Sequence, residues 1–261
     1  MSGRAAAHWV RFLDGDTARF GTLEHGGQRV RVCDGDLFAG ALPTERTLAL
    51  ADVQLLPPVV PGKIVALWNN FHALGAKLNL PVPAEPLYLL KATTSVLSPG
   101  GVIRRPRCDG KVVFEGELAI VIGKTASGVG ESRALEHVLG YTCANDVTLA
   151  DILQRDPSFP QWARAKGFDT FCPLGPAIAT GLDPATLVVK TILNGELRQD
   201  YPISDMRFSV AQLVSLISQD MTLEPGDLIL CGTSVGAGSM KPGSTIEVEI
   251  AGVGRLTNRF D

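Results

Sequence analysis

The chain has 261 residues, a net charge of −3, 45% apolar residues and 20% charged residues. This length suits one large domain with a small appended unit, and the composition is typical of a globular protein. Basic residues do not cluster, no apolar run is long enough to span a membrane, and the N-terminus lacks the apolar segment of a secretory signal. We therefore expect neither nucleic acid nor a membrane as a partner.

The N-terminal 60 residues are predicted to form a small β-rich domain. Three segments, "HWVRFLD", "ARFGTLEH" and "QRVRVCD", alternate or nearly alternate between apolar and polar residues. Glycine-containing turn signals separate them. Prolines then lead into a new apolar run, "KIVALW", and the boundary lies near Pro57 to Gly62. We therefore divide the chain into residues 1–60 and 61–261.

The second part is predicted to be mainly β-structure. Short apolar runs are punctuated by glycine and proline, and only two segments favour a helix. One is "TLADILQRD", which follows Asp146, and the other is "SVAQLVSLISQ", with Ser209 as its cap and apolar residues at helical spacing. Many short strands with few helices indicate an α+β, β-rich roll or barrel.

The run "FEGELAIVIGK" at 114–124 carries two glutamates, Glu115 and Glu117. Residues two apart share a strand face, and both faces of this run become apolar, so the strand should be buried on both sides. Because unpaired buried charge is costly, the pair is either a solvated strand end or a metal or acid–base site. By contrast, Glu247 and Glu249 in "STIEVEIAG" share a face with no bulky apolar residue, which is typical of a half-exposed strand.

A third acid, Asp146 in "GYTCANDVT", lies where an apolar strand ends. It is either a helix N-cap or the third member of an oxygen-only ligand cluster with Glu115 and Glu117. Such a cluster needs a cation to stay compact and ionised, and it suits Mg²⁺, Mn²⁺ or Ca²⁺ better than Zn²⁺. The five cysteines are odd in number and widely spaced, with no C-x-x-C pair. They favour a reducing cytoplasm over a disulfide framework or a zinc site.

Five segments in order resemble the signature blocks of the fumarylacetoacetate hydrolase family. They are "FEGELAIVIGK", "GYTCANDVT", "KGFDTFCPLGP", "LNGELRQ" and "MTLEPGDLILCGTSVG", and the resemblance covers residues 63–261. It implies a mixed β-sandwich roll, usually homodimeric, and the small N-terminal unit also fits the family. It further implies that Glu115, Glu117 and Asp146 bind Mg²⁺ or Mn²⁺ in a cytoplasmic enzyme that acts on a small 2-oxo acid.

The resemblance also assigns roles in chemistry. A metal-stabilised enolate would permit C–C hydrolysis of an acylpyruvate or fumarylacetoacetate-like compound, which is our leading expectation. Decarboxylation, hydration, isomerisation and tautomerisation use the same enolate, and a non-catalytic binding relative is a further alternative. Lys166 in "KGFDTF" matches the family's active-site lysine, and Thr233 in "CGTSVG" matches a substrate-contacting threonine. Lys91 in "LYLLKATTS" resembles another family lysine, and we expect it to bind substrate.

Two departures from the family pattern concern the substrate end of the site. His72 in "WNNFHALG" matches a lid histidine that activates water, but Gly75 stands where the family has its partner glutamate. His72 is therefore either an unassisted base or an ordinary loop histidine. Ala150 and Leu153 replace an arginine and a glutamine, so the distal pocket should be more apolar. This argues against a dicarboxylate substrate such as fumarylacetoacetate itself.

Overall fold

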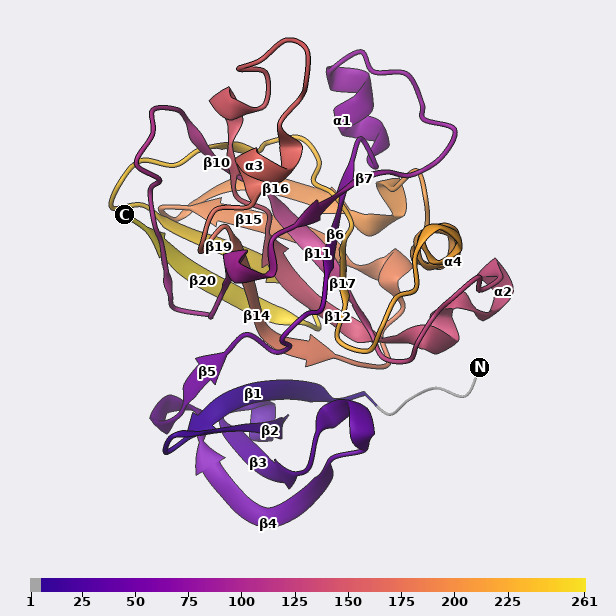
Figure 1. The fold of residues 1–261 in the computed structure, drawn as a ribbon. Helices are drawn as coiled ribbons and strands as arrows, with labels where there is room; N and C mark the ends of the chain where they lie inside the picture. Colours follow the sequence, from indigo (N-terminus) through magenta and orange to yellow (C-terminus); the bar gives the residue numbers. More distant parts are fainter. Residues whose placement is uncertain (1–5) are drawn as a thin grey trace.

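The computed structural model describes residues 6–261, and its N-terminal strands form a separate lobe (Figure 1). The strands are β1 (His8–Asp14), β2 (Thr17–Glu24), β3 (Arg29–Asp34), β4 (Leu42–Ala49) and β5 (Gln54–Leu56). They pair in the order β4-β3-β2-β1, and β5 lies on the other edge of β1. The first residues of β1 also pair with β14 (Cys172–Ala179), so the lobe continues the main sheet. The boundary at residue 60 stays a prediction.

The main sheet continues beyond β14 through five more strands. Its order is β14-β12-β11-β17-β6-β7, formed by β12 (Val138–Asn145), β11 (Gly116–Ile122), β17 (Leu228–Leu230), β6 (Ile64–Trp68) and β7 (Leu87–Lys91), while β8 (Val96–Leu97) pairs with β14. Every residue of β11 is buried, which confirms the strand predicted from its apolar faces. This strand is central because β12 and β17 cover both of its edges.

A second sheet packs across β11 and β12 (Figure 1). Its order is β16 (Glu196–Pro202), β15 (Val188–Leu193), β19 (Thr245–Ile250), β20 (Gly254–Phe260) and β9 (Val102–Ile103). A three-stranded sheet joins β13 (Thr148–Leu149), β10 (Val112–Phe114) and β18 (Gly238–Ser239). Glu247 and Glu249 alternate with buried residues along β19 and pair with Arg255, so the prediction of a half-exposed strand is confirmed.

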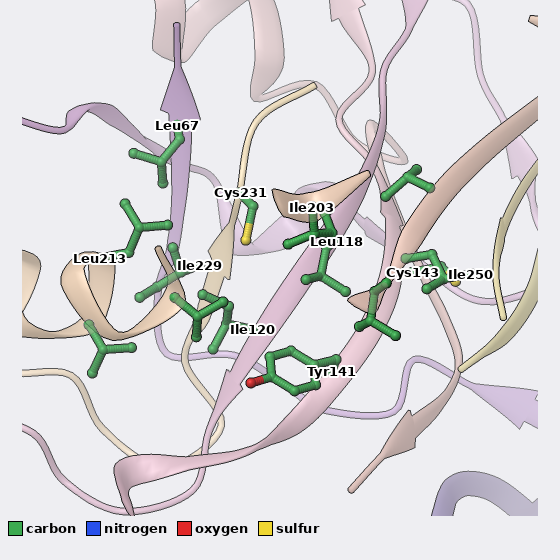
Figure 2. Packing of buried hydrophobic residues seen from close by; sticks show 14 of the residues in the cluster. Leu67, Leu118, Ile120, Tyr141, Cys143, Ile203, Leu213, Ile229, Cys231 and Ile250 are labelled. Carbon is green, nitrogen blue, oxygen red and sulfur yellow. The ribbon is translucent and has the colours of Figure 1, made fainter. Parts of the chain in front are cut away.

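The core lies between the two sheets and under one helix. Figure 2 shows Leu118, Ile120 and Ile229 of the main sheet together with Leu213 of α4 (Val210–Asp220). The other helices are short: α1 (His72–Lys77), α2 (Glu131–Ala134) and α3 (Trp162–Lys166). Helix α4 begins with the predicted Ser209 cap, completed by Gln212 in a capping box. The α+β, β-rich fold is thus confirmed, and no helix within residues 6–261 is long and apolar enough to cross a membrane.

The helix predicted after Asp146 is wrong. Thr148 and Leu149 instead form β13, which pairs with β10, and only a 3-10 turn follows at Ala150–Ile152. Lys111 fixes this arrangement because its backbone N–H donates to the Asp151 carboxylate (2.6 Å) and its carbonyl accepts from the Ala150 N–H (3.0 Å). Tertiary pairing therefore overrides local helix propensity, and Asp146 is not a helix cap.

Candidate metal and active site

The three predicted acids lie together. One carboxylate oxygen each of Glu115, Glu117 and Asp146 falls within a group whose members are all within 4.8 Å of one another. Glu117 lies in β11, Glu115 directly precedes it, and Asp146 follows the neighbouring antiparallel strand β12. The Asp146 N–H donates to the Glu115 carbonyl (2.8 Å), so strand pairing itself brings the third carboxylate beside the first two.

The residue between the two glutamates, Gly116, lies too close to the second sheet to carry a side chain. A Cβ atom at this position would lie 2.1 Å from the Thr191 hydroxyl oxygen on β15, so no side chain fits. The Gly116 N–H donates to the Gln199 side-chain oxygen on β16 (3.1 Å). The second sheet thus packs closely against the backbone between Glu115 and Glu117. This packing fixes the backbone from which both carboxylates extend.

Lys166, at the end of α3, directs its ammonium group into the acidic cluster. Its Nζ lies 2.8 Å from Glu115 Oε2, 2.6 Å from Asp146 Oδ2 and 2.7 Å from the Thr148 hydroxyl. Burial alone would lower the pKa of Lys166, but Asp146, Glu115 and Glu117 outweigh it and raise the pKa above its usual value. The three carboxylates therefore favour the protonated form of Lys166 in the metal-free protein.

Lys91 lies on the other side of Asp146. Its fully buried Nζ contacts Asp146 Oδ1 at 2.6 Å and donates to the carbonyls of Lys166 and Phe171. Burial would raise the pKa of Asp146, but Lys166 and Lys91 together hold it below its usual value. Since an ammonium group has three protons, the donors of Lys91 are all used. Substrate binding by Lys91 stays a prediction, and these contacts favour a role in holding Asp146.

Glu117 has an unsatisfied oxygen. Its Oε2 accepts from the Gly232 N–H (2.7 Å), whereas Oε1 is buried with no hydrogen-bond partner within residues 6–261. Burial and the nearby Asp146 charge raise the pKa of Glu117 well above its usual value. Three carboxyl groups face two ammonium groups here, so Glu117 has no cationic partner among the described residues. This oxygen-only donor set with an unpaired carboxylate oxygen fits a divalent cation such as Mg²⁺, Mn²⁺ or Ca²⁺.

Thr233 is also at the cluster, but its hydroxyl has protein partners. Its Oγ1 donates to the Gly116 carbonyl (3.1 Å) and accepts from Gln199 Nε2 (2.8 Å), and Tyr201 donates to the same carbonyl. Sequence reasoning gave no role to Gln199 or Tyr201. Both alternate with the charged residues Arg198 and Asp200, and this period of two is a sequence signal that could have placed them on the inner face of β16. Substrate contact by Thr233 stays a prediction.

His72 lies outside this cluster of contacts. It is the exposed first residue of α1 and has no hydrogen-bond or ion-pair partner within residues 6–261. The next residue, Ala73, donates its N–H to Asp205 (3.0 Å). A second tie is made by Asn70, whose carbonyl and side-chain oxygen accept from the N–H groups of Arg207 and Phe208. The segment that carries His72 is therefore docked on residues 205–208.

Position 75 faces a cation. A Cβ atom at Gly75 would lie 1.9 Å from Arg207 Nη2, so the guanidinium group occupies the space beside the backbone. The Nε and Nη1 atoms of Arg207 are buried without a hydrogen-bond partner in the described residues. A glutamate here would therefore meet Arg207 first. The sequence revealed the missing acid but not the arginine, because residues 75 and 207 are brought together only by the fold.

Asn70 links this segment to the metal ligands. Its Nδ2 donates to the Cys231 carbonyl (2.9 Å), one residue before Gly232, whose N–H holds Glu117. Gly232 has a φ of +86°, a conformation that favours glycine, and this turns its N–H toward the carboxylate. A short chain of contacts therefore joins the docked segment to Glu117.

Comparison with known protein families identifies the family to which this site belongs. The profile of the fumarylacetoacetate (FAA) hydrolase C-terminal family matches residues 63–261, and an Rv2993c-like N-terminal profile matches residues 7–58. The chain belongs to the fumarylacetoacetate hydrolase family. The resemblance noted in the sequence blocks is thus confirmed.

Similar proteins in this family carry different activities in their names. The chain is 36% identical to the oxaloacetate tautomerase fahd2 of Xenopus laevis. The match covers 82% of this chain and 70% of the relative. The chain is 39% identical to the crystal structure of a 2-hydroxyhepta-2,4-diene-1,7-dioate isomerase from Mycobacterium marinum, with a TM-score of 0.89 and coverage of 97% and 98%. A maleylpyruvate hydrolase from Sphingobium, solved with manganese and pyruvate, is 28% identical, with a TM-score of 0.80 and the same coverage.

Proposed function

We propose that the protein is a divalent-metal-dependent enzyme that forms an enolate from a small 2-oxo acid. We place isomerisation, tautomerisation or decarboxylation ahead of C–C hydrolysis. The observation that carries the proposal is the buried Lys166 ammonium among Glu115, Asp146 and Thr148, beside the unpaired oxygen of Glu117. When bound by these carboxylates, a divalent cation supplies a Lewis acid that polarises the 2-oxo group.

Lys166 contributes a fixed positive charge. Its contacts place it within hydrogen-bonding distance of two of the three candidate ligands, and therefore next to any substrate oxygen that reaches them. Its three protons are directed at Glu115, Asp146 and Thr148, so it stabilises negative charge that develops on that oxygen as a nearby fixed cation rather than through a hydrogen bond. Lys91 and Gly232 act one step further out, by holding Asp146 and Glu117.

The preference against hydrolysis comes from the segment that carries His72 and Gly75. Hydrolysis needs a base that activates an attacking water, and His72 has no carboxylate partner among the described residues. At position 75, where the family has its acid, the neighbour is the Arg207 guanidinium. Decarboxylation forms the enolate with neither an attacking water nor a base, whereas isomerisation and tautomerisation need a group that moves a proton at C3 but no attacking water. The names of the tautomerase and isomerase relatives support this order of reactions.

Hydrolysis remains the second candidate because of Asp205. Its carboxylate already accepts from the N–H of Ala73, next to His72, at 3.0 Å. A rotation of the exposed His72 side chain would let Asp205 orient the imidazole in place of the missing glutamate. The name of the maleylpyruvate hydrolase also supports this alternative.

The test is a screen of the metal-supplemented protein with oxaloacetate, an acylpyruvate and a 2-hydroxydienoate, with products identified by NMR. We expect keto–enol interconversion, double-bond isomerisation or decarboxylation to exceed hydrolysis. Hydrolysis as the fastest reaction, abolished in both His72→Ala and Asp205→Asn, would establish the second candidate instead. If no 2-oxo acid is bound or turned over, the proposed substrate class is wrong. The choice of Mg²⁺, a homodimer and a cytoplasmic location stay predictions.

A further inference from the structure

Two tryptophans lie where the end of β6, which leads into α1, meets α3. The ring centroids of Trp68 and Trp162 are 4.9 Å apart, with the planes tilted by 46°. Trp68 is the last residue of β6, shortly before α1, and Trp162 is the first residue of α3. Both are only partly buried. Figure 1 shows α1 and α3 at the same end of the molecule. Large aromatic surface is thus left partly open at this end.

Both elements lead directly to the metal ligands. Trp162 and Lys166 are four residues apart in α3, so they share a helix face, and the lysine side chain leans toward the turn that contains the tryptophan. Trp68 follows Leu67, whose carbonyl oxygen lies 3.2 Å from the Cβ position of Gly232. Because Gly232 holds Glu117 and Lys166 contacts Glu115 and Asp146, each tryptophan lies on an element that also carries a contact to the centre.

A third apolar residue, Leu153, lies near the two tryptophans. The Gln161 N–H donates to the Leu153 carbonyl (3.0 Å), so Leu153 is held next to the start of α3. Leu153 packs against the neighbouring hydrophobic cluster and is partly exposed. We call the partly exposed residues Trp68, Trp162 and Leu153, which lie together at the start of α3, the wall.

We propose that Trp68 and Trp162 bind the distal end of the substrate, and that this end is an aromatic or bulky aliphatic group. The inference rests on the proposed function: the 2-oxo acid head lies at the carboxylate cluster, and its substituent at C3 extends over the indole rings. An aromatic ring on this wall gains burial of apolar area and favourable ring–ring contact. The preferred substrates are then aryl- or alkyl-substituted pyruvates, rather than dicarboxylates.

The experiment compares two ligands with the same head group. Pyruvate and phenylpyruvate are titrated into the Mg²⁺- or Mn²⁺-loaded protein, and binding is followed by calorimetry and by tryptophan fluorescence. The Trp9→Phe variant serves as background, because it leaves only Trp68 and Trp162 as emitters. We expect phenylpyruvate to bind at least about ten-fold more tightly than pyruvate and to quench this emission. Trp162→Ala and Trp68→Ala should each weaken phenylpyruvate by about ten-fold and pyruvate by less than about two-fold.

The outcomes separate this inference from the proposed function. If neither ligand binds the metal-loaded protein, the proposed function itself fails. If pyruvate binds but phenylpyruvate binds no more tightly, or if the alanine variants weaken both ligands equally, the aromatic wall does not bind substrate. Trp162→Gln is a second variant in case the alanine protein does not fold. The comparison of the two ligands in the Trp9→Phe protein needs no change in the wall at all.

Discussion

Replacement of Lys91 by methionine should destabilise the protein before any substrate is present. The Nζ atom of Lys91 lies 2.6 Å from Asp146, and the side chains of the two residues are 0% and 1% exposed. Methionine fills a similar volume, but it leaves Asp146 with Lys166 as its only cationic partner in the described part of the chain and removes the donor to two carbonyls. Breaking such a buried pair costs about 3–5 kcal/mol.

This cost converts into a measurable shift in melting temperature. The unfolding entropy of a chain of 261 residues is about 0.55 kcal/mol per kelvin. The Lys91→Met protein should therefore melt about 5–9 °C below the wild type in metal-free buffer. The assay is thermal unfolding followed by circular dichroism, and the matched control is Lys124→Met, because Lys124 is exposed. A shift no larger than in the control would refute the positioning role and return Lys91 to the predicted contact with substrate.

Three further predictions concern the reaction and the metal. Lys166→Met should lower kcat by about 10²-fold or more while calorimetry still detects Mg²⁺ binding, and unchanged turnover would exclude its role in stabilising charge. Gly75→Glu should leave the ratio of hydrolysis to decarboxylation unchanged, because the new carboxylate pairs with Arg207, whereas Gly75→Glu with Arg207→Ala should raise it. Product analysis decides, and a higher ratio in the single variant would show that Arg207 does not capture the acid. The raised pKa of Glu117 means that the metal-free protein keeps a proton there above the usual value of 4.5. Bound metal must displace this proton, so Mg²⁺ affinity should rise with pH by up to about ten-fold per unit. A Mg²⁺ affinity that does not change with pH would contradict the binding of metal by Glu117.

The elements that could be predicted are those with a strong local pattern. Strand β11 follows from an apolar run with two apolar faces, and α4 follows from its capping residue and helical spacing. The acidic cluster was also within reach, because Glu115 and Glu117 are two apart on a buried strand. Their chemical need for a partner does not depend on the rest of the fold.

The remaining contacts depend on tertiary register and could not be predicted. The segment after Asp146 has the propensity of a helix, but its pairing with residues 111–113 makes it a strand and a turn. Likewise, no sequence pattern indicates that Arg207 lies against Gly75, or that Lys91 touches Asp146. These contacts join residues more than 30 positions apart, so they arise only when the sheets assemble.

The central claim is that Glu115, Glu117 and Asp146 hold a divalent cation, and the β19 glutamates provide a matched control. Glu249, like Glu117, lies two residues after another glutamate in a strand, but it is partly exposed and paired with Arg255. Mg²⁺ and Mn²⁺ are titrated by calorimetry into the wild type, Glu117→Gln and Glu249→Gln. We predict that the wild type and Glu249→Gln bind one ion with equal affinity, and that Glu117→Gln loses at least about 100-fold. Equal binding by Glu117→Gln and the wild type would contradict the account.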